Sequence, residues 1–177
     1  DNKGNTGSPP NKARLFVVDL RTGALLKQIN LPGKRSGLGG VRLVKNVHNQ
    51  IVAGYAGDQL GNLWRFDMND PSPSAWKVGM GGQPLFTAST ANVDKPILGT
   101  PEYVVHPQGG QMVIFGTGQL HAIDHLTDVS QQSLFGIWDK VPGNLDSTAA
   151  DRVTSAGSII KQRFTGTMGS GANLFYL

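Results

Sequence analysis

Short stretches of alternating apolar and polar residues, separated by turn-forming residues, run along most of the chain. Alternation with a period of two residues is typical of β-strands, and Gly, Pro, Asn and Asp mark the turns between them. The pattern predicts strands over residues 14–20, 24–29, 41–47, 50–56, 62–67, 76–78, 85–88, 103–106, 111–116, 133–140, 156–164 and 172–177. No long segment has helical periodicity, so the expected fold class is all-β.

The clearest unit is a hairpin over residues 50–67. Residues 57–62 hold Gly, Asp and Asn, which suit a turn because Gly permits positive φ and the other two bond nearby backbone groups. Trp64 and Phe66 alternate on the second strand, which predicts one large apolar face. A lone hairpin is not stable in water, so this one must belong to a larger sheet assembly.

A second hairpin is predicted around Asp19, whose side chain can cap the turn together with Thr22. Asp19 and Asp67 each follow an apolar strand, and their separation is close to the ~40–50 residues of one propeller blade. Such blades contain four strands and repeat radially. We therefore expect a linker over 1–12 and about three blades of a partial β-propeller over 13–177, cut short at both ends relative to the natural protein. A β-sandwich is the structural alternative.

Composition narrows the classes of site. The chain has no cysteine, which excludes disulfides, thiolate metal sites and a Cys nucleophile. No apolar run approaches the ~20 residues of a membrane helix. The net charge of +4 is unevenly distributed. Residues 1–45 hold nine Lys or Arg and two Asp, whereas residues 46–177 hold seven Lys or Arg and ten Asp or Glu. The basic third leaves polyanion binding open, although its scattered charges favour an ordinary solvated surface.

Two histidines offer the nearest approach to a metal motif. His121 and His125 are four residues apart, which on a helix would place both on one face. Asp124 and Asp128 are the additional ligands at hand, in a short polar segment. A surface loop explains this segment better than a zinc site.

Several acidic and amide residues have the same two interpretations. Asp58 and Asn62 are able to offer oxygens to a cation, but turn stabilisation accounts for both. Asp139 follows a Trp-containing strand in the way that Asp67 and Asp19 follow theirs. We interpret these three aspartates as structural residues at blade edges.

Other motifs lack the context that their chemistry requires. The G-T-G at 116–118 has neither the third Gly nor the helix of a dinucleotide site, and the G-S-G at 169–171 is not a nucleophile elbow. Core packing accounts for Trp64, Trp76 and Trp138 better than exposed binding does. We assign no catalytic, cofactor-binding or metal-binding residue.

Four blocks in order resemble the C-terminal region of the PilY/PilC family of type IV pilus biogenesis and adhesion proteins. They lie at 13–25, 55–68, 112–118 and 124–139, so the resemblance covers roughly 13–140. It implies a modified β-propeller with quinoprotein-like blades, secreted and placed at the pilus tip or bacterial cell surface. It also implies roles in pilus assembly, adhesion and twitching motility, with pilus proteins such as minor pilins, and a host surface, as partners.

The chain departs from that family at one place. Family members often carry an acidic calcium loop just before the second block, but residues 42–50 contain no Asp or Glu. Calcium needs about six to eight oxygen ligands, and Arg42 and Lys45 would repel it. We therefore expect no calcium loop at this position and no cofactor in this segment.

These observations favour a non-enzymatic protein that acts through protein or host-surface contacts. One alternative is a quinoprotein-like propeller enzyme, for which the chain shows no ligands to quinone or calcium. The other is a polyanion-binding module that uses residues 1–45.

Overall fold

The computed structural model describes residues 12–33, 36–89, 95–119, 123, 125, 130–154 and 159–162, the last range by its backbone alone. The strands are β1 (Arg14–Val18), β2 (Leu25–Asn30), β3 (Leu38–Lys45), β4 (Ile51–Asp58), β5 (Asn62–Asp67), β6 (Lys77–Val78), β7 (Phe86–Thr87), β8 (Glu102–Val105), β9 (Gln111–Gly116), β10 (Leu134–Asp139) and β11 (Ile159–Gln162). Short 3-10 turns lie at η1 (Pro73–Ala75), η2 (Met80–Gly82) and η4 (Ala149–Asp151). The all-β prediction is confirmed, and none of the described helices is long and apolar enough to cross a membrane.

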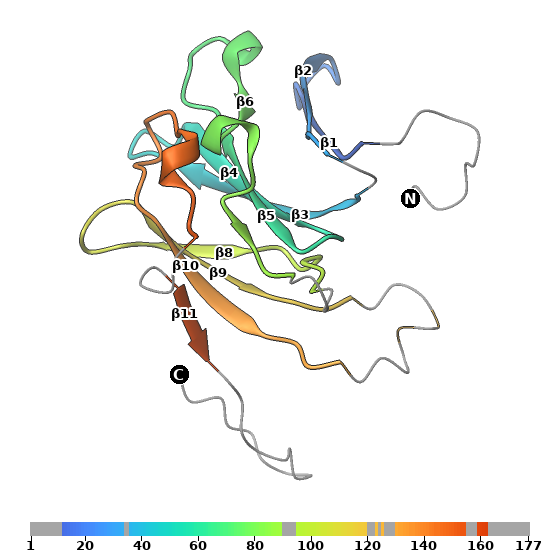
Figure 1. Ribbon diagram of the computed structural model, residues 1–177. Helices are drawn as coiled ribbons and strands as arrows, with labels where there is room; N and C mark the ends of the chain where they lie inside the picture. Colours follow the sequence, from blue (N-terminus) through green and yellow to red (C-terminus); the bar gives the residue numbers. More distant parts are fainter. Residues whose placement is uncertain are drawn as a thin grey trace, which may run out of the picture.

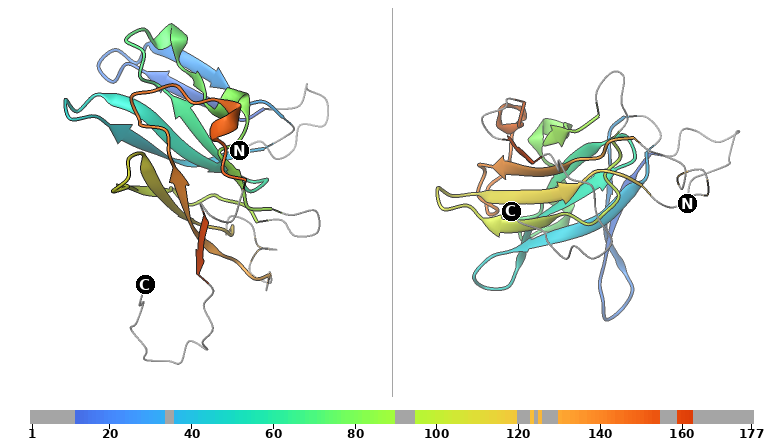
Figure 2. Two further views of the ribbon diagram at one scale, coloured as in Figure 1. Left: turned by 60° about the vertical axis from the view of Figure 1, so that its left-hand side comes forward. Right: turned by 90° about the horizontal axis from the view of Figure 1, so that it is seen from below.

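The strands form antiparallel sheets in which neighbours in sequence pair (Figure 1). β1 and β2 make a two-stranded sheet, and β8 to β11 make a four-stranded sheet in the order β11-β10-β9-β8. The central sheet has the order β3-β4-β5-β6, and β7 also pairs with β5. The central sheet lies between the β1–β2 hairpin and the β8–β11 sheet (Figure 2).

This arrangement buries both faces of the β4–β5 hairpin. Trp64 and Phe66 share one face, as predicted, and pack with Ile29 from β2. On the opposite face, Tyr55 and Leu63 join a second cluster with residues of β9 and β10. The expectation of a single apolar face was therefore incomplete, because the sheet is covered on both sides.

Glycines permit close approach between β-strands and the segment at 97–100. β3 begins at Leu38, earlier than predicted, because Gly39 extends the strand where a side chain would not fit. A Cβ atom on Gly39 would lie 2.6 Å from the carbonyl oxygen of Leu98, and one on Gly57 would lie 2.2 Å from that of Ile97.

Two parts of the predicted organisation stay untested. The strand expected over 172–177 and most of the linker expected over 1–12 lie outside the described residues. The strand expected over 156–164 appears as the shorter β11. The assignment of 13–177 to about three blades of a truncated propeller stays a prediction.

Candidate functional site: a buried ion-pair network and a groove

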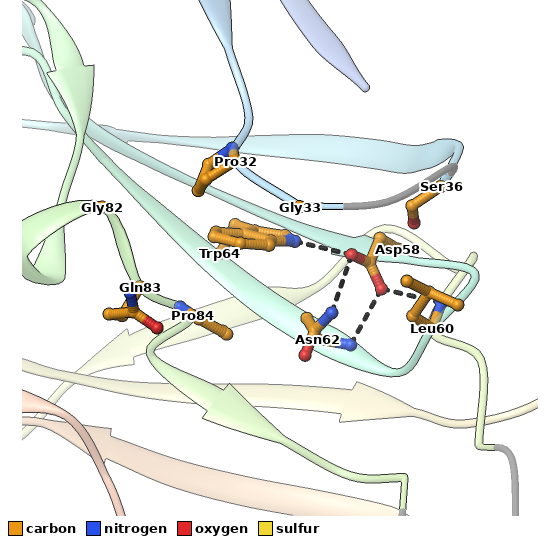
Figure 3. A pocket seen from close by; sticks show the side chains of 10 residues that line it. All are labelled: Pro32, Gly33, Ser36, Asp58, Leu60, Asn62, Trp64, Gly82, Gln83 and Pro84. Carbon is orange, nitrogen blue, oxygen red and sulfur yellow. Dashed lines mark hydrogen bonds between the residues drawn. The ribbon is translucent and has the colours of Figure 1, made fainter. Parts of the chain in front are cut away.

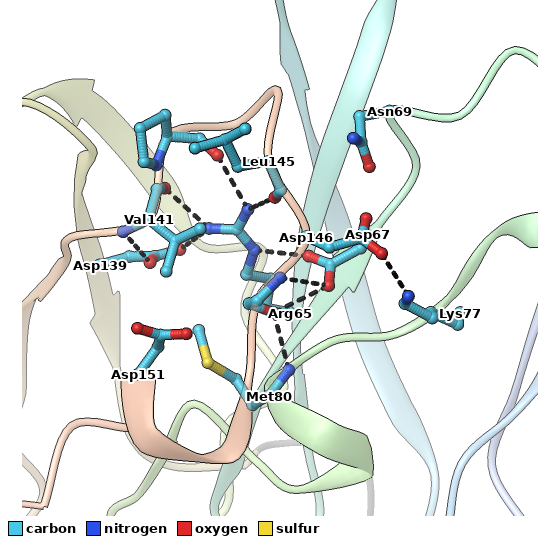
Figure 4. A network of polar contacts seen from close by, with 12 residues as sticks. Arg65, Asp67, Asn69, Lys77, Met80, Asp139, Val141, Leu145, Asp146 and Asp151 are labelled. Atoms are coloured by element: carbon cyan, nitrogen blue, oxygen red, sulfur yellow. Dashed lines mark hydrogen bonds and ion pairs between the residues drawn. The ribbon is translucent and has the colours of Figure 1, made fainter.

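Arg65 is the centre of a polar network inside the molecule. The alternation of β5 places it on the face opposite Trp64, and its side chain has no exposed surface. Its Nε atom donates to Oδ1 of Asp67 at 2.8 Å, and its Nη1 atom donates to Oδ2 of Asp139 at 2.5 Å (Figure 4). Because Asp139 ends β10, the network joins the central sheet to the β8–β11 sheet.

The remaining guanidinium donors hold the loop that follows β10. Nη1 also donates to the carbonyl of Val141 at 2.9 Å, and Nη2 donates to the carbonyls of Pro142 at 3.2 Å and Leu145 at 3.0 Å. A guanidinium has five N–H donors, so all of them are used within the protein. Arg65 therefore fixes the loop over 140–147 against β5.

Neutral donors complete the coordination of the two carboxylates. Oδ2 of Asp67 accepts bonds from the backbone N–H of Ser147 at 2.9 Å and from its hydroxyl at 2.8 Å. The Tyr55 hydroxyl donates to Oδ2 of Asp139 at 2.6 Å, and Oδ1 accepts the N–H of Val141 at 3.1 Å. Two carboxylates thus face one guanidinium, and the hydrogen bonds offset the excess negative charge.

The pKa directions describe a structural site. Burial raises the pKa of the Tyr55 hydroxyl well above its ordinary value, and Asp139 raises it further, so Tyr55 stays a neutral donor. Burial alone would lower the pKa of Arg65, but Asp139, Tyr55 and Asp67 together raise it. Neither group changes protonation near neutral pH, so the network acts as a clamp between sheets.

Asp19, Asp67 and Asp139, which the sequence analysis interpreted as equivalent structural residues at blade edges, have different roles. Asp19 is partly exposed and caps its turn, where its Oδ1 accepts bonds from the N–H groups of Arg21 and Thr22 and from the Thr22 hydroxyl. Asp67 and Asp139 are buried and share Arg65. Sequence reasoning missed Arg65, because an arginine that alternates with Trp64 and Phe66 in a strand ordinarily faces solvent.

Asp58 has the turn role that its neighbours indicated. Its Oδ1 accepts the N–H groups of Leu60 at 2.8 Å and Asn62 at 2.9 Å. Its Oδ2 accepts the Asn62 amide at 3.0 Å and the Trp64 indole N–H at 2.8 Å (Figure 3). These four bonds occupy the lone-pair positions of the carboxylate, so no oxygen of Asp58 is left for a cation.

The other candidate ligands do not assemble where the structure describes them. His121, Asp124 and Asp128 lie outside the described residues, so the zinc hypothesis is untested. Arg42 forms an ion pair with Glu102, an arrangement that does not suit a neighbouring cation. Within the described ranges, no three His, Cys, Asp or Glu side chains lie close enough to hold a metal ion.

The glycine motifs and the three tryptophans agree with the sequence-based predictions in part. The backbone N–H of Ser133 donates to the hydroxyl of Thr117 at 2.8 Å, which connects the end of β9 to the segment before β10, so 116–118 is a structural turn. The G-S-G at 169–171 lies outside the described residues. Trp64 is in the core and Trp76 packs partly against it. Trp138 contradicts the core-packing prediction, because it lies half-exposed on the outward face of β10, stacked on His106 at 4.0 Å.

Two hollows that share lining residues lie beside the central sheet. A pocket of about 270 Å³ lies beside the Asp58 turn (Figure 3), and one of its lining residues, Ser36, has a buried hydroxyl without a hydrogen-bond partner. A wider groove of about 600 Å³, here called the β2 groove, is lined by Lys12, Lys27–Pro32, Trp76–Val78 and Gly81–Gln83. The two hollows share Pro32, Gly82 and Gln83.

Comparison with known proteins identifies a family with this architecture. The family model described as the PilY1 beta-propeller domain matches residues 2–169. The chain belongs to this family. The all-β fold is therefore of the β-propeller type, and the β-sandwich alternative is rejected.

The PilY1 relatives support the same placement. The type IV pilus biogenesis factor PilY1 of Pseudomonas aeruginosa PAO1 is 38% identical over 73% of this chain and 13% of its own length. A PilY1 homolog of Xylella fastidiosa is 31% identical over 75% of this chain and 10% of its own. The crystal structure of the P. aeruginosa PilY1 C-terminal domain matches with a TM-score of 0.68 and 33% identity, over 76% of this chain and 33% of that domain chain. The chain thus spans only a small part of its curated relatives.

Proposed function

We propose that this chain is the propeller part of a type IV pilus biogenesis factor, and that it contributes to pilus assembly through protein contacts without catalysing a reaction. The observation that carries the proposal is its membership of the PilY1 beta-propeller family, whose relatives are named for pilus biogenesis. The finer roles proposed here are adhesion and twitching motility, at the bacterial cell surface or pilus tip after secretion. The proposed partners are pilus proteins, including minor pilins, and a host surface.

The buried network supports the non-enzymatic part of the proposal. Every donor of Arg65 and each oxygen of Asp67 and Asp139 has a structural partner. A catalytic group must reach a substrate and exchange charge or protons with it. The Arg65 network has no exposed surface through which to do so. We further propose that this segment works without a calcium ion at 42–50, where Arg42 is paired with Glu102.

Deletion of the gene that encodes the complete protein tests the pilus role. We expect fewer surface pili and reduced twitching, both restored by the wild-type gene and by an Arg42→Met version. Arg65→Met should fail to restore them, because it destroys the clamp. Unchanged piliation after deletion would contradict the proposal.

Incubation of the purified chain with a quinone cofactor and calcium tests the enzyme alternative. We expect no bound chromophore after gel filtration. A stoichiometric chromophore with dehydrogenase activity would favour the quinoprotein alternative instead.

A further inference from the structure

The β2 groove has an open strand edge along one side. Within the described chain, β2 pairs with β1 alone. The N–H of Leu31 donates to the carbonyl of Ala13, and hydrogen-bonded pairs alternate along an antiparallel ladder. Gln28 and Asn30 therefore fall at the alternate positions, where backbone N–H and C=O groups point away from β1. Both residues line the groove.

The charged residues that line the β2 groove are lysines. Lys12, Lys27 and Lys77 line it, and none of its described lining residues is acidic. The Lys27 ammonium donates to the carbonyl of Ser74 and, with the exposed Lys12, gives the rim its positive charge, whereas Lys77 is paired with Asp146. Such a rim attracts an acidic partner.

The lining offers apolar contact as well as charge. Trp76 and Val78 are both half-buried, and they face the groove together with the buried Leu31. Gln83 also lines the neighbouring pocket, which holds the unpartnered Ser36 hydroxyl. The two hollows therefore offer both apolar and polar lining residues.

We propose that the β2 groove binds an extended peptide segment that carries acidic side chains. The peptide adds its main chain to the open edge of β2, while its acidic side chains meet the lysines at the rim. Strand addition of this kind derives affinity from main-chain bonds and specificity from the side-chain sites. A sulfated saccharide would match the lysines but not the donors and acceptors at strand spacing on Gln28 and Asn30. This names the partner class for the protein contacts proposed above, and it rests on that function.

A change at Asn30 tests the main-chain bonds. The probe is a fluorescein-labelled decapeptide of alternating Glu and Val, bound to the full chain and followed by fluorescence anisotropy. Asn30→Pro removes the N–H that faces the groove and leaves the β1–β2 ladder intact, because Pro is tolerated where the lost N–H faces outward. Asn30→Ala is the matched control that keeps this donor. We expect Asn30→Pro to weaken binding about tenfold relative to Asn30→Ala.

A second pair of measurements leaves the protein unchanged. The same peptide, N-methylated at alternate residues to block its own donors, should bind about tenfold more weakly than the unmodified peptide. A heparin-derived hexasaccharide should not compete with the peptide at equal charge concentration. These results do not depend on how well any variant folds.

Charge reversal tests the rim. Lys27→Glu should weaken binding of the peptide severalfold, whereas Lys45→Glu, an exposed change on β3 outside the groove, should leave it unchanged. Equal binding by Asn30→Pro and Asn30→Ala, indifference to N-methylation, or competition by the saccharide would each overturn the proposal. If binding fails in this way while the gene deletion still reduces the number of surface pili, the groove proposal is wrong and the pilus proposal stands.

Discussion

Both faces of the central sheet bury apolar side chains, but the face toward β8–β11 adds a buried ion-pair network to them. Toward β8–β11, the fully buried Arg65 joins Asp67 and Asp139 and holds the loop over 140–147. Toward the β1–β2 hairpin, the contact is mainly apolar, with Ile29 and Leu31 packed against residues of β5. Apolar burial is non-directional, whereas a buried ion pair requires a defined geometry. The interface toward β8–β11 therefore has a geometry fixed by the network in addition to its buried apolar area, whereas the interface toward the hairpin depends on apolar area.

This difference explains where a binding site has room to form. The clamped interface uses its polar groups internally and leaves no donor of Arg65 for a ligand. At the interface with the hairpin, no other described strand pairs with the outward edge of β2, and the β2 groove opens beside it. Partner binding is thus expected at the interface whose packing tolerates adjustment.

Arg65→Met should have the largest effect on stability. The substitution leaves two buried carboxylates without their cation, and breaking a buried pair in this way costs about 3–5 kcal/mol. Urea unfolding should show this as a lower free energy of unfolding. The matched control is Arg42→Met, because Arg42 and Glu102 form an exposed pair whose loss costs about 0–1 kcal/mol. Equal losses in the two variants would show that the network does not hold the sheets together.

Tyr55→Phe should have an intermediate effect at neutral pH. It removes the hydroxyl that donates to buried Asp139 at 2.6 Å and that also contacts Oε1 of Gln111 at the longer distance of 3.3 Å. Leaving a buried acceptor short of a partner costs about 1–3 kcal/mol. The control is Tyr103→Phe, which changes a tyrosine that is only partly buried. A larger loss in the control would contradict the assigned role of Tyr55.

The same variant gives a pH signature. The pKa of Tyr55 is raised in the folded state, so the unfolded chain releases this proton first as pH rises above about 10. Tyr55 therefore contributes stability that is fully present below pH ~10 and is lost as pH rises above it, at up to about 1.4 kcal/mol per pH unit. Unfolding measured between pH 8 and 11 should show a shallower decline in Tyr55→Phe than in wild type. Parallel declines would show that Tyr55 ionises normally in the folded state.

The local units of this fold could be predicted from sequence, because each carries its own turn chemistry. The Asp19 turn and the hairpin over 50–67 are specified by residues a few positions apart. The contact between Arg65 and Asp139 was not predictable in this way, because 74 residues separate its partners and an arginine in a strand ordinarily faces water. The early start of β3 was missed for a related reason, since Gly39 indicates a loop unless the approach of Leu98 is known.

The β2 groove shows the same limit. Lys27 and Lys77 belong to strands that do not pair, and only the packing of the hairpin against the central sheet brings them to one hollow. Sequence analysis found the basic character of residues 1–45 but had no means of locating a partner site. A site formed by segments that are distant in sequence could not be located from the sequence alone.

Ile29→Val should have the smallest effect, and it tests the apolar interface directly. Ile29 is buried where β2 meets the central sheet, and removing one methylene from a core typically costs about 0.5–1.5 kcal/mol. Leu25→Val is the matched control, because Leu25 is exposed on the same strand and should show almost no loss. The loss for Ile29→Val should also be the same at pH 8 and pH 11, unlike the difference made by Tyr55. If Ile29→Val instead cost as much as Arg65→Met, the hairpin would be held by close shape complementarity, and the contrast between the two interfaces would fail.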